Sequence, residues 1–204
     1  PLLFGFTTPV WCKPLWVVAA GVVAVIVALY VFRYLLALVA PKVATVARAT
    51  GKECVAQPLF YILMLAGIFL LVFFVYLPYF TFGEDIKVVE ENGLTLIMLL
   101  SVILALWTSS VSIAEEIEGR TALTVLCKPV SRREFILGKF LGILGPVLIL
   151  FVVLGAVFLC TVSYKVVFEA RENGMPSPTS LDCQMEIARI APGLFLAFLE
   201  AVVL

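Results

Sequence analysis

Long uninterrupted runs of apolar residues constrain this chain more than any other feature. A helix needs about 20 apolar residues to cross the hydrocarbon core of a membrane, and four stretches meet that length, at about residues 15–32, 58–80, 94–113 and 140–164. A fifth run, 190–204, is truncated. The runs are solidly apolar rather than alternating, which excludes the strands of a transmembrane barrel. The sequence therefore predicts an all-α fold, a polytopic bundle of about four full transmembrane helices and part of a fifth.

The overall composition agrees with lipid as the solvent. Hydrophobic residues make up 63% of the chain and charged residues 14%, whereas a soluble domain is nearer half apolar and a quarter charged. The net charge is zero, which disfavours nucleic acid as a partner. The chain has no histidine, so a histidine-based metal or catalytic centre is excluded. The Gly-rich P-loop that cradles nucleotide phosphates is also missing from the sequence.

Basic residues alternate between the connecting segments and predict an orientation. Segments 41–57 and 114–139 are rich in Lys and Arg, while segment 81–93 carries a single Lys and segment 165–189 is mixed. Connections rich in Lys and Arg stay on the cytoplasmic side of a membrane. We therefore expect a multi-pass protein of the cell membrane, with an exterior N-terminus and segments 41–57 and 114–139 inside. A bacterial inner membrane is the expected location.

The two ends of the chain look cut. It begins at Pro1 without an initiator Met and stops at Leu204 within an apolar run. We interpret it as a fragment that lacks C-terminal spans. Residues 1–40 are expected to form an exterior segment and an extra transmembrane helix, and residues 41–204 the main transmembrane domain.

A short amphipathic helix is predicted at residues 43–57, directly before the second span. Apolar and small residues lie on one side of it, and Arg48, Lys52 and Glu53 lie on another. Such a helix is suited to the membrane interface. Pro58 then begins the second span, a position at which proline is well tolerated. An ordinary interfacial linker remains the alternative.

The charged segment 114–139 is the most distinctive part of the sequence. Glu115, Glu116 and Glu118 follow the third span. Acidic residues oppose the dipole at a helix C-terminus, so we expect a new short helix to begin at these residues. Leu123 and Leu126 would give that helix an apolar face for a groove on a cytosolic partner.

The end of segment 114–139 predicts the start of the next helix. Pro129 stops the short helix, and Ser131 and Glu134 have the spacing of a capping box. Arg133 and Lys139 are then placed to anchor the new helix at the anionic inner leaflet.

Arg33 is the one charge embedded in an apolar run. An intramembrane charge can mark a substrate or ion site. Alternatively, the side chain extends to the inner headgroups, with its stem against apolar surface. We prefer this second interpretation because Tyr30 and Tyr34 place Arg33 near the inner interface.

Small and hydroxyl side chains leave further alternatives open. Gly138 and Gly142 form a G-x-x-x-G pattern that could serve packing within the chain or between subunits. Thr108, Ser110 and their neighbours could line a polar path, but hydroxyl groups that bond to their own helix are favoured. Among the five cysteines, Cys12 and Cys183 are both expected outside, and nothing in their spacing requires them to pair.

The charged segment resembles the cytoplasmic coupling segment of ABC-2 type transporter permeases. The family pattern is an acidic turn, Gly-Thr, leucines, Pro-hydrophobic-Ser-Arg, and Gly-Lys before the next span. The matching residues are Glu115, Glu116, Glu118, Gly119, Thr121, Leu123, Leu126, Lys128, Pro129, Val130, Ser131, Arg132, Gly138 and Lys139. Arg120 departs from the pattern by standing between Gly119 and Thr121. The resemblance extends over residues 46–164, and residues 43–57 then correspond to the elbow helix of such permeases.

The resemblance implies a function that the residues alone do not define. It implies a permease subunit of an ATP-driven exporter, with ATP and Mg bound by a separate ATPase subunit and a second permease subunit as partner, commonly in a homodimer. In that reading the chain is not itself an enzyme and holds no cofactor. Residues Glu116, Glu118 and Arg120 would contact the ATPase. The alternative is a polytopic membrane protein that binds or assembles other proteins without transport. The substrate is not defined by the sequence.

Overall fold

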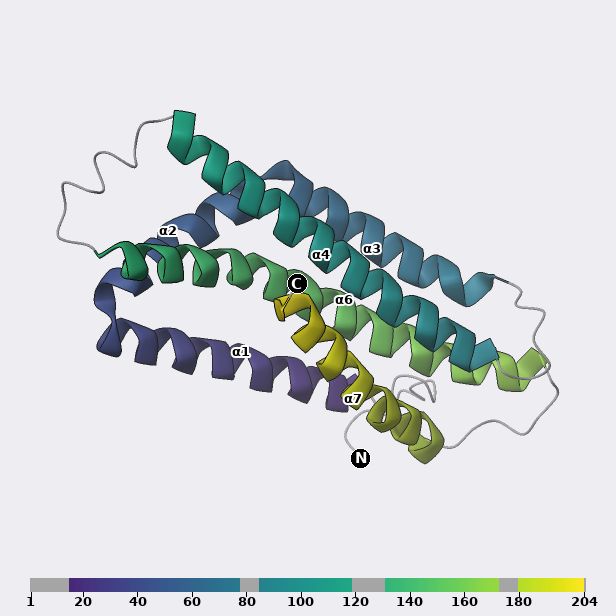
Figure 1. Cartoon of the computed structure of the whole chain (residues 1–204). Helices are drawn as coiled ribbons and strands as arrows, with labels where there is room; N and C mark the ends of the chain where they lie inside the picture. The colour runs from purple at the N-terminus through teal and green to yellow at the C-terminus, as the bar shows by residue number, and fades with distance from the viewer. Residues whose placement is uncertain (1–14, 78–84, 119–130, 173–179, 204) are drawn as a thin grey trace.

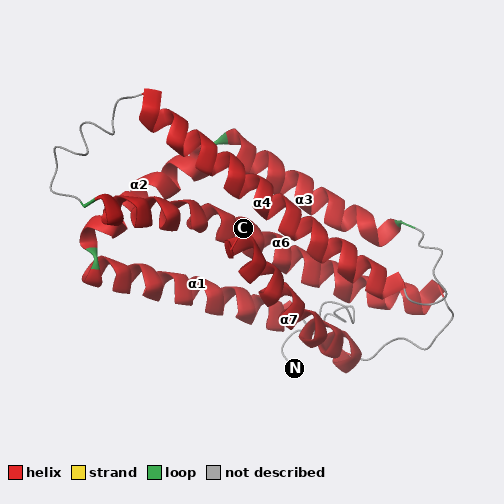
Figure 2. Cartoon of the chain, in the orientation of Figure 1, coloured by secondary structure: helices red, strands yellow, loops and turns green. Residues whose placement is uncertain are grey.

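The computed structural model describes residues 15–77, 85–118, 131–172 and 180–203. Its helices are α1 (Leu15–Val39), α2 (Pro41–Ala56), α3 (Pro58–Tyr76), α4 (Asp85–Glu118), α6 (Arg132–Glu172) and α7 (Ser180–Val203). Within these ranges the chain contains helices and short connections but no strand (Figure 2). The predicted all-α fold is confirmed.

Four of the described helices are long and apolar enough to cross a membrane, namely α1, α3, α4 and α6. The predicted polytopic bundle is therefore confirmed. α7 is more polar, since Asp182, Glu186 and Arg189 lie in its first turns and its apolar stretch begins at Ile190. α2 is a 16-residue helix with a proline at its start, which agrees with the expected short helix before the second span.

α6 is the central helix of the bundle and packs against each of the other five described helices (Figure 1). Leu150, Leu154 and Phe158 of α6 have no exposed surface. The core that surrounds them also contains Phe60 and Leu71 of α3, Ile97, Leu100 and Leu104 of α4, and Ile190 of α7. Because lipid is as apolar as these side chains, the bundle is stabilised by close van der Waals packing rather than by removal from water.

The end of α4 differs from the prediction. We expected a new short helix at Glu115, but α4 continues without a break to Glu118. Glutamate is a good helix former, and the sequence has no Gly or Pro before Gly119 that would interrupt the helix. An unfavourable charge near a helix C-terminus costs only about 0.3–1 kcal/mol, which is too little to break a helix that is already formed.

Helix α6 also extends further than expected. The fourth span was predicted to end near residue 164, yet α6 continues to Glu172. Lys165 was placed in an exterior connection, but only 2% of its surface is exposed. Its ammonium group lies 5.5 Å from the centre of the Phe168 ring, a distance at which cations and aromatic rings attract. One long helix therefore replaces the first part of that connection.

α1 is the least embedded helix. Val18 is its single buried residue among those described, and most of its large side chains, including Trp16, Tyr30 and Tyr34, are exposed. α1 contacts the rest of the bundle through α2 and α6. Most of the surface of α1 is therefore left uncovered by the other described helices.

Candidate coupling site

The two ends of the charged segment lie at the same end of the bundle. There α4 ends, α6 begins and α2 lies close to both, at the left of Figure 1. Eight of the residues assigned to ATPase coupling lie outside the described residues: Gly119, Arg120, Thr121, Leu123, Leu126, Lys128, Pro129 and Val130. Their assignment stays a prediction. The backbone places Glu115, Glu116 and Glu118 in the last turns of α4, and Arg132 at the first position of α6.

Ser131 and Glu134 form the predicted capping box at the start of α6. The backbone N–H of Ser131 donates to Oε2 of Glu134 at 2.9 Å, and the N–H of Glu134 donates to Oγ of Ser131 at 3.3 Å. Each side chain thereby satisfies a backbone donor at the helix start. Lys42 of α2 interacts electrostatically with the Glu134 carboxylate. The start of α6 is thus fixed at the exit of the charged segment.

Lys139 connects α6 with α4. Its Nζ donates to the backbone oxygen of Ser112 and to the Ser112 hydroxyl, at 2.8 Å in both cases. The ammonium group also lies 5.8 Å from the centre of the Phe135 ring. Ser112 is buried near the end of α4, so the bond is shielded from water on one side. This contact joins the helices that precede and follow residues 119–130.

The G-x-x-x-G pattern of α6 packs within the chain, against α2. A Cβ atom added to Gly138 would lie 2.7 Å from Cβ of Val46, and one added to Gly142 would lie 2.7 Å from Cβ of Thr50 and 3.0 Å from the Ala47 oxygen. Any side chain at either position would collide with α2. The glycines therefore allow the close approach that holds α2 against the first turns of α6.

The residues assigned as lipid anchors have different surroundings. Arg133 is exposed at the start of α6. Lys139 has the partner in α4 described above. Arg33 extends from α1 towards α2 and α6, since a Cβ atom built on Gly51 or on Gly145 would lie 4.0 Å from its Nη2. Contact of these three residues with lipid headgroups stays a prediction.

Hydroxyl groups of α4 bond back to their own helix, as favoured from the sequence. Thr108 donates to the Leu104 oxygen at 2.8 Å, and Ser110 donates to the Leu106 oxygen at the same distance. These hydroxyls are therefore satisfied without a polar path. Ser112 differs because its hydroxyl meets Lys139 from another helix.

A second polar group, at the opposite end of the bundle, was missed from the sequence. The buried Lys165 of α6 lies at this end, and Nη1 of Arg189 lies 3.8 Å from Oε2 of Glu186 in α7. One signal could have indicated the burial of Lys165. Lys165 follows Phe158 and Val162 at the spacing of one helix face, and both of these residues are fully buried.

Three cysteines lie among the described residues, Cys54, Cys160 and Cys183, and none of the three forms a disulfide there. Burial raises the pKa of the Cys183 thiol, and the hydroxyl of Ser163, which is hydrogen-bonded to it, lowers the pKa by less. Cys12, its possible partner, lies outside the described residues. Among the described residues no group of three or more Cys, Asp or Glu side chains is arranged to hold a metal ion.

The fold and the site define a multi-pass membrane protein with a charged segment between two of its spanning helices, which a hydrogen-bonded contact joins. A family model described as ABC-2 family transporter protein matches residues 71–177, just over half of the chain. The chain therefore belongs to the ABC-2 family of transporter proteins, which confirms the resemblance of the charged segment. The match includes all of α4, the charged segment and α6. No curated protein and no solved structure gave a match.

Proposed function

We propose that this chain is the permease subunit of an ATP-driven exporter and that residues 119–130 receive movement from a separate ATPase subunit. The observation that carries the proposal is the Lys139–Ser112 contact, which joins the helices on both sides of this segment. A force on the segment then acts on α4 and α6 together. Membership of the ABC-2 family supports the same role.

The packing of α2 extends the proposed coupling beyond α4 and α6. Gly138 and Gly142 leave no space between α6 and α2, so a displacement of the α6 N-terminus carries α2 with it. Packed helices of this kind move as units between discrete arrangements. Closure of the ATPase subunits on ATP would shift the equilibrium between an arrangement open to the inside and one open to the outside.

The partner contacts follow from the chemistry of the segment. Glu116, Glu118 and Arg120 are proposed to form polar contacts with the ATPase, and Leu123 and Leu126 to fill an apolar groove on it. Pro129 and Ser131 would fix the turn into α6. ATP and Mg would be bound by the ATPase subunit, and a second permease subunit, commonly a second copy of this chain, would complete the translocation path.

The test is to replace Leu123 and Leu126 together by Asp and to purify the tagged chain from its native membranes. We expect ATP hydrolysis to co-purify with the unchanged chain and to be lost with the double Asp variant, because two charges cannot enter an apolar groove without a partner. The matched control replaces both residues by Met, which keeps an apolar face of similar volume.

Two outcomes would contradict the proposal in different ways. If the double Asp variant retained the co-purifying ATPase, the contact face would lie elsewhere. If no ATP hydrolysis accompanied the unchanged chain, the alternative of a membrane protein that assembles partners without transport would replace the proposal.

A further inference from the structure

Two adjoining cavities lie between α1 and the other helices, beside the contacts that α1 makes with α2 and α6. Their volumes are about 450 and 440 Å³, and both are lined in part by Val25, Leu148 and Phe198. Because they share these three residues, the cavities lie end to end, and we call the two together the α1 groove. It runs along α1 and α6, with α7 on its side at one end and α2 at the other.

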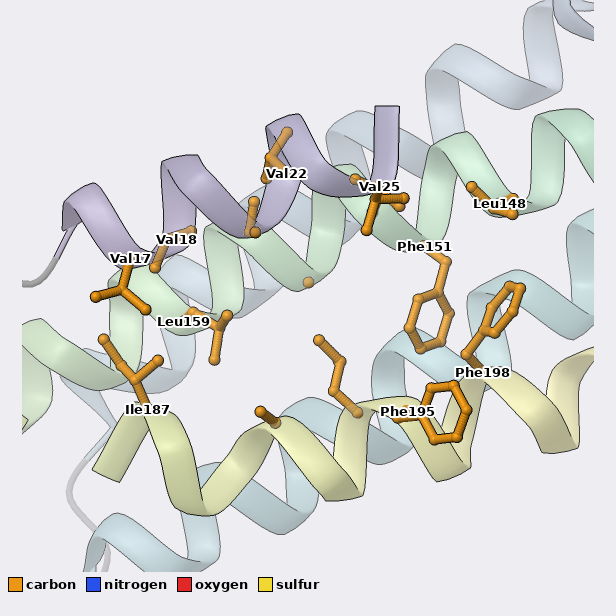
Figure 3. Close-up of a pocket in the computed structure, with 16 residues that line it drawn as sticks. Val17, Val18, Val22, Val25, Leu148, Phe151, Leu159, Ile187, Phe195 and Phe198 are labelled. Carbon is orange, nitrogen blue, oxygen red and sulfur yellow. The ribbon is translucent and has the colours of Figure 1, made fainter. Parts of the chain in front are cut away.

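The end of the α1 groove near α7 has only apolar walls. Val17, Val18 and Val22 of α1 lie across the cavity from Ile187 and Phe195 of α7 (Figure 3). No lining side chain of this cavity carries a polar atom. A ligand in this part must therefore be a hydrocarbon.

The end of the α1 groove near α2 has the same apolar walls with two exceptions, Arg33 and Arg48. Among the described residues neither guanidinium has a hydrogen bond or an ion pair. Arg33 reaches from α1 towards α2 and α6, since its Nη2 lies 4.0 Å from a Cβ atom built on Gly51 or on Gly145. Both side chains are exposed, so at a membrane interface two guanidinium groups at one end of a hydrocarbon groove favour an anionic headgroup there.

The length of the α1 groove fits an amphiphile. Val17 and Arg33 are separated by 16 residues, so the groove follows α1 for about 24 Å. That is most of the hydrocarbon core, which is about 30 Å thick. A transmembrane helix, by contrast, is about 10 Å across with its side chains and is far larger than either cavity. The dimensions favour an extended chain of methylene groups over a helix of a protein partner.

We propose that the α1 groove binds one phospholipid with an anionic headgroup. The phosphate group accepts hydrogen bonds from Arg33 and Arg48, and an acyl chain lies between α1 and α6 as far as Ile187. Anionic lipids are concentrated in the leaflet that basic interfacial segments contact, and α2 is such a segment. The bound lipid supplies α1 with the packing that the protein itself does not provide.

Native mass spectrometry of the delipidated chain, titrated with phosphatidylglycerol or with phosphatidylcholine of the same acyl chains, tests the headgroup site. We expect one phosphatidylglycerol to bind in preference to phosphatidylcholine. The double variant Arg33→Gln, Arg48→Gln should lose about thirtyfold in affinity for phosphatidylglycerol, since each cation near an anionic lipid contributes about a factor of five. Arg133→Gln, which removes an exposed charge outside the groove, is the control and should bind as the unchanged chain does.

A second variant tests the acyl-chain site without changing any charge. No atom lies within 4 Å of the Cβ position of Gly21, so Gly21→Phe fits and fills the groove. We expect it to reduce binding of both lipids. The control, Ala20→Phe, places the same ring on an exposed position that does not line the groove and should have no effect.

Three results would overturn the proposal. These are equal binding of the two lipids, binding that survives both the arginine and the Gly21 variants, and protection of a Val25→Cys thiol from maleimide by a second protein chain in the absence of lipid. Every measurement reports lipid binding or protection of the α1 groove. The result therefore does not depend on whether the proposed ATPase subunit binds the chain.

Discussion

The ammonium group of Lys139 donates hydrogen bonds to the backbone oxygen and to the hydroxyl of Ser112, each over 2.8 Å. The two residues are 27 positions apart and belong to the helices that flank residues 119–130. This lysine, which is also expected to anchor α6 at the inner leaflet, links α6 to α4 through these bonds. The charged segment is thereby attached to a pair of helices rather than to either one alone.

We predict that Lys139→Met lowers the free energy of unfolding by about 1.5–3 kcal/mol, because hydrogen bonds to a charged group contribute on that scale. Ser112→Ala should cost less, since the backbone oxygen still accepts from Lys139. The two changes together should cost little more than Lys139→Met alone, because they remove the same contact. Unfolding of each variant in detergent, followed by circular dichroism, measures these differences. Fully additive losses would show that the residues act separately.

Gly142→Leu should displace α2 from α6. Its Cβ would already lie 2.7 Å from Cβ of Thr50, so the larger side chain forces the helices apart at a cost of about 1–3 kcal/mol. Gly21→Leu is the matched control, because its Cβ would meet no atom within 4 Å. The same unfolding measurement should separate the two variants. If the Gly142→Leu and Gly21→Leu variants were equally stable, the result would contradict close packing of α2 against α6 at Gly142.

The capping box predicts the susceptibility of the α6 N-terminus to protease. Ser131→Ala removes a cap that is typically worth about 1 kcal/mol, so the open form of the first turn should increase about fivefold. Limited trypsin digestion, with cleavage after Arg132 and Arg133 followed by mass spectrometry, reports that increase. Ser131→Asp retains an oxygen acceptor, so this variant should resist trypsin as well as the unchanged chain does. Equal digestion of the Ala and Asp variants would show that the side chain of residue 131 does not cap α6.

The environment of Cys183 predicts a pH-dependent reactivity. Burial holds the pKa of this thiol above its ordinary value of 9.0. At a pH at which the thiol of the unfolded chain ionises, the thiol of the folded protein is therefore still protonated. Maleimide labelling of the folded chain should therefore lag behind that of the denatured chain throughout the neutral range. The variant Cys183→Ser is the control, because the labelled peptide that it lacks is the one that contains Cys183.

The same shift has a consequence for stability. Above about pH 9 the unfolded state binds fewer protons at Cys183 than the folded state, so this group makes stability fall as the pH rises. Below that pH both states hold the proton and the contribution to pH dependence is absent. Replacement by Ser should remove this alkaline loss. An unchanged alkaline profile in Cys183→Ser would assign the loss to other groups.

Much of the fold followed from the sequence because its signals are local. Apolar runs of membrane length located α1, α3, α4 and α6, and the spacing of Ser131 and Glu134 located the start of α6. The order of residues in the charged segment indicated the family that the comparison confirmed. Each of these signals is contained in a few dozen consecutive residues.

Contacts between distant segments were the part that could not be predicted. The pattern of Gly138 and Gly142 marks a close approach but does not say to which helix, and α2 provides it. The positive charge of Lys165 suggested an exterior connection, whereas packing of its long stem keeps it in α6. Similarly, the unfavourable interaction of Glu115 to Glu118 with the helix dipole suggested that α4 ends before them. Continuation of the helix to Glu118 outweighs that small cost.

The 41 residues of α6 form a single helix, which is about 62 Å long and thus about twice the thickness of the hydrocarbon core. The helix is therefore long enough for both of its ends to extend beyond the hydrocarbon core. A ligand that binds one arrangement of α6 more tightly than another would shift the equilibrium at both ends of the helix, and the linkage would operate equally in reverse. Antibodies or ligands that bind beside Lys165 at one end of α6 should consequently change the affinity for the ATPase subunit that we propose to act at the other end.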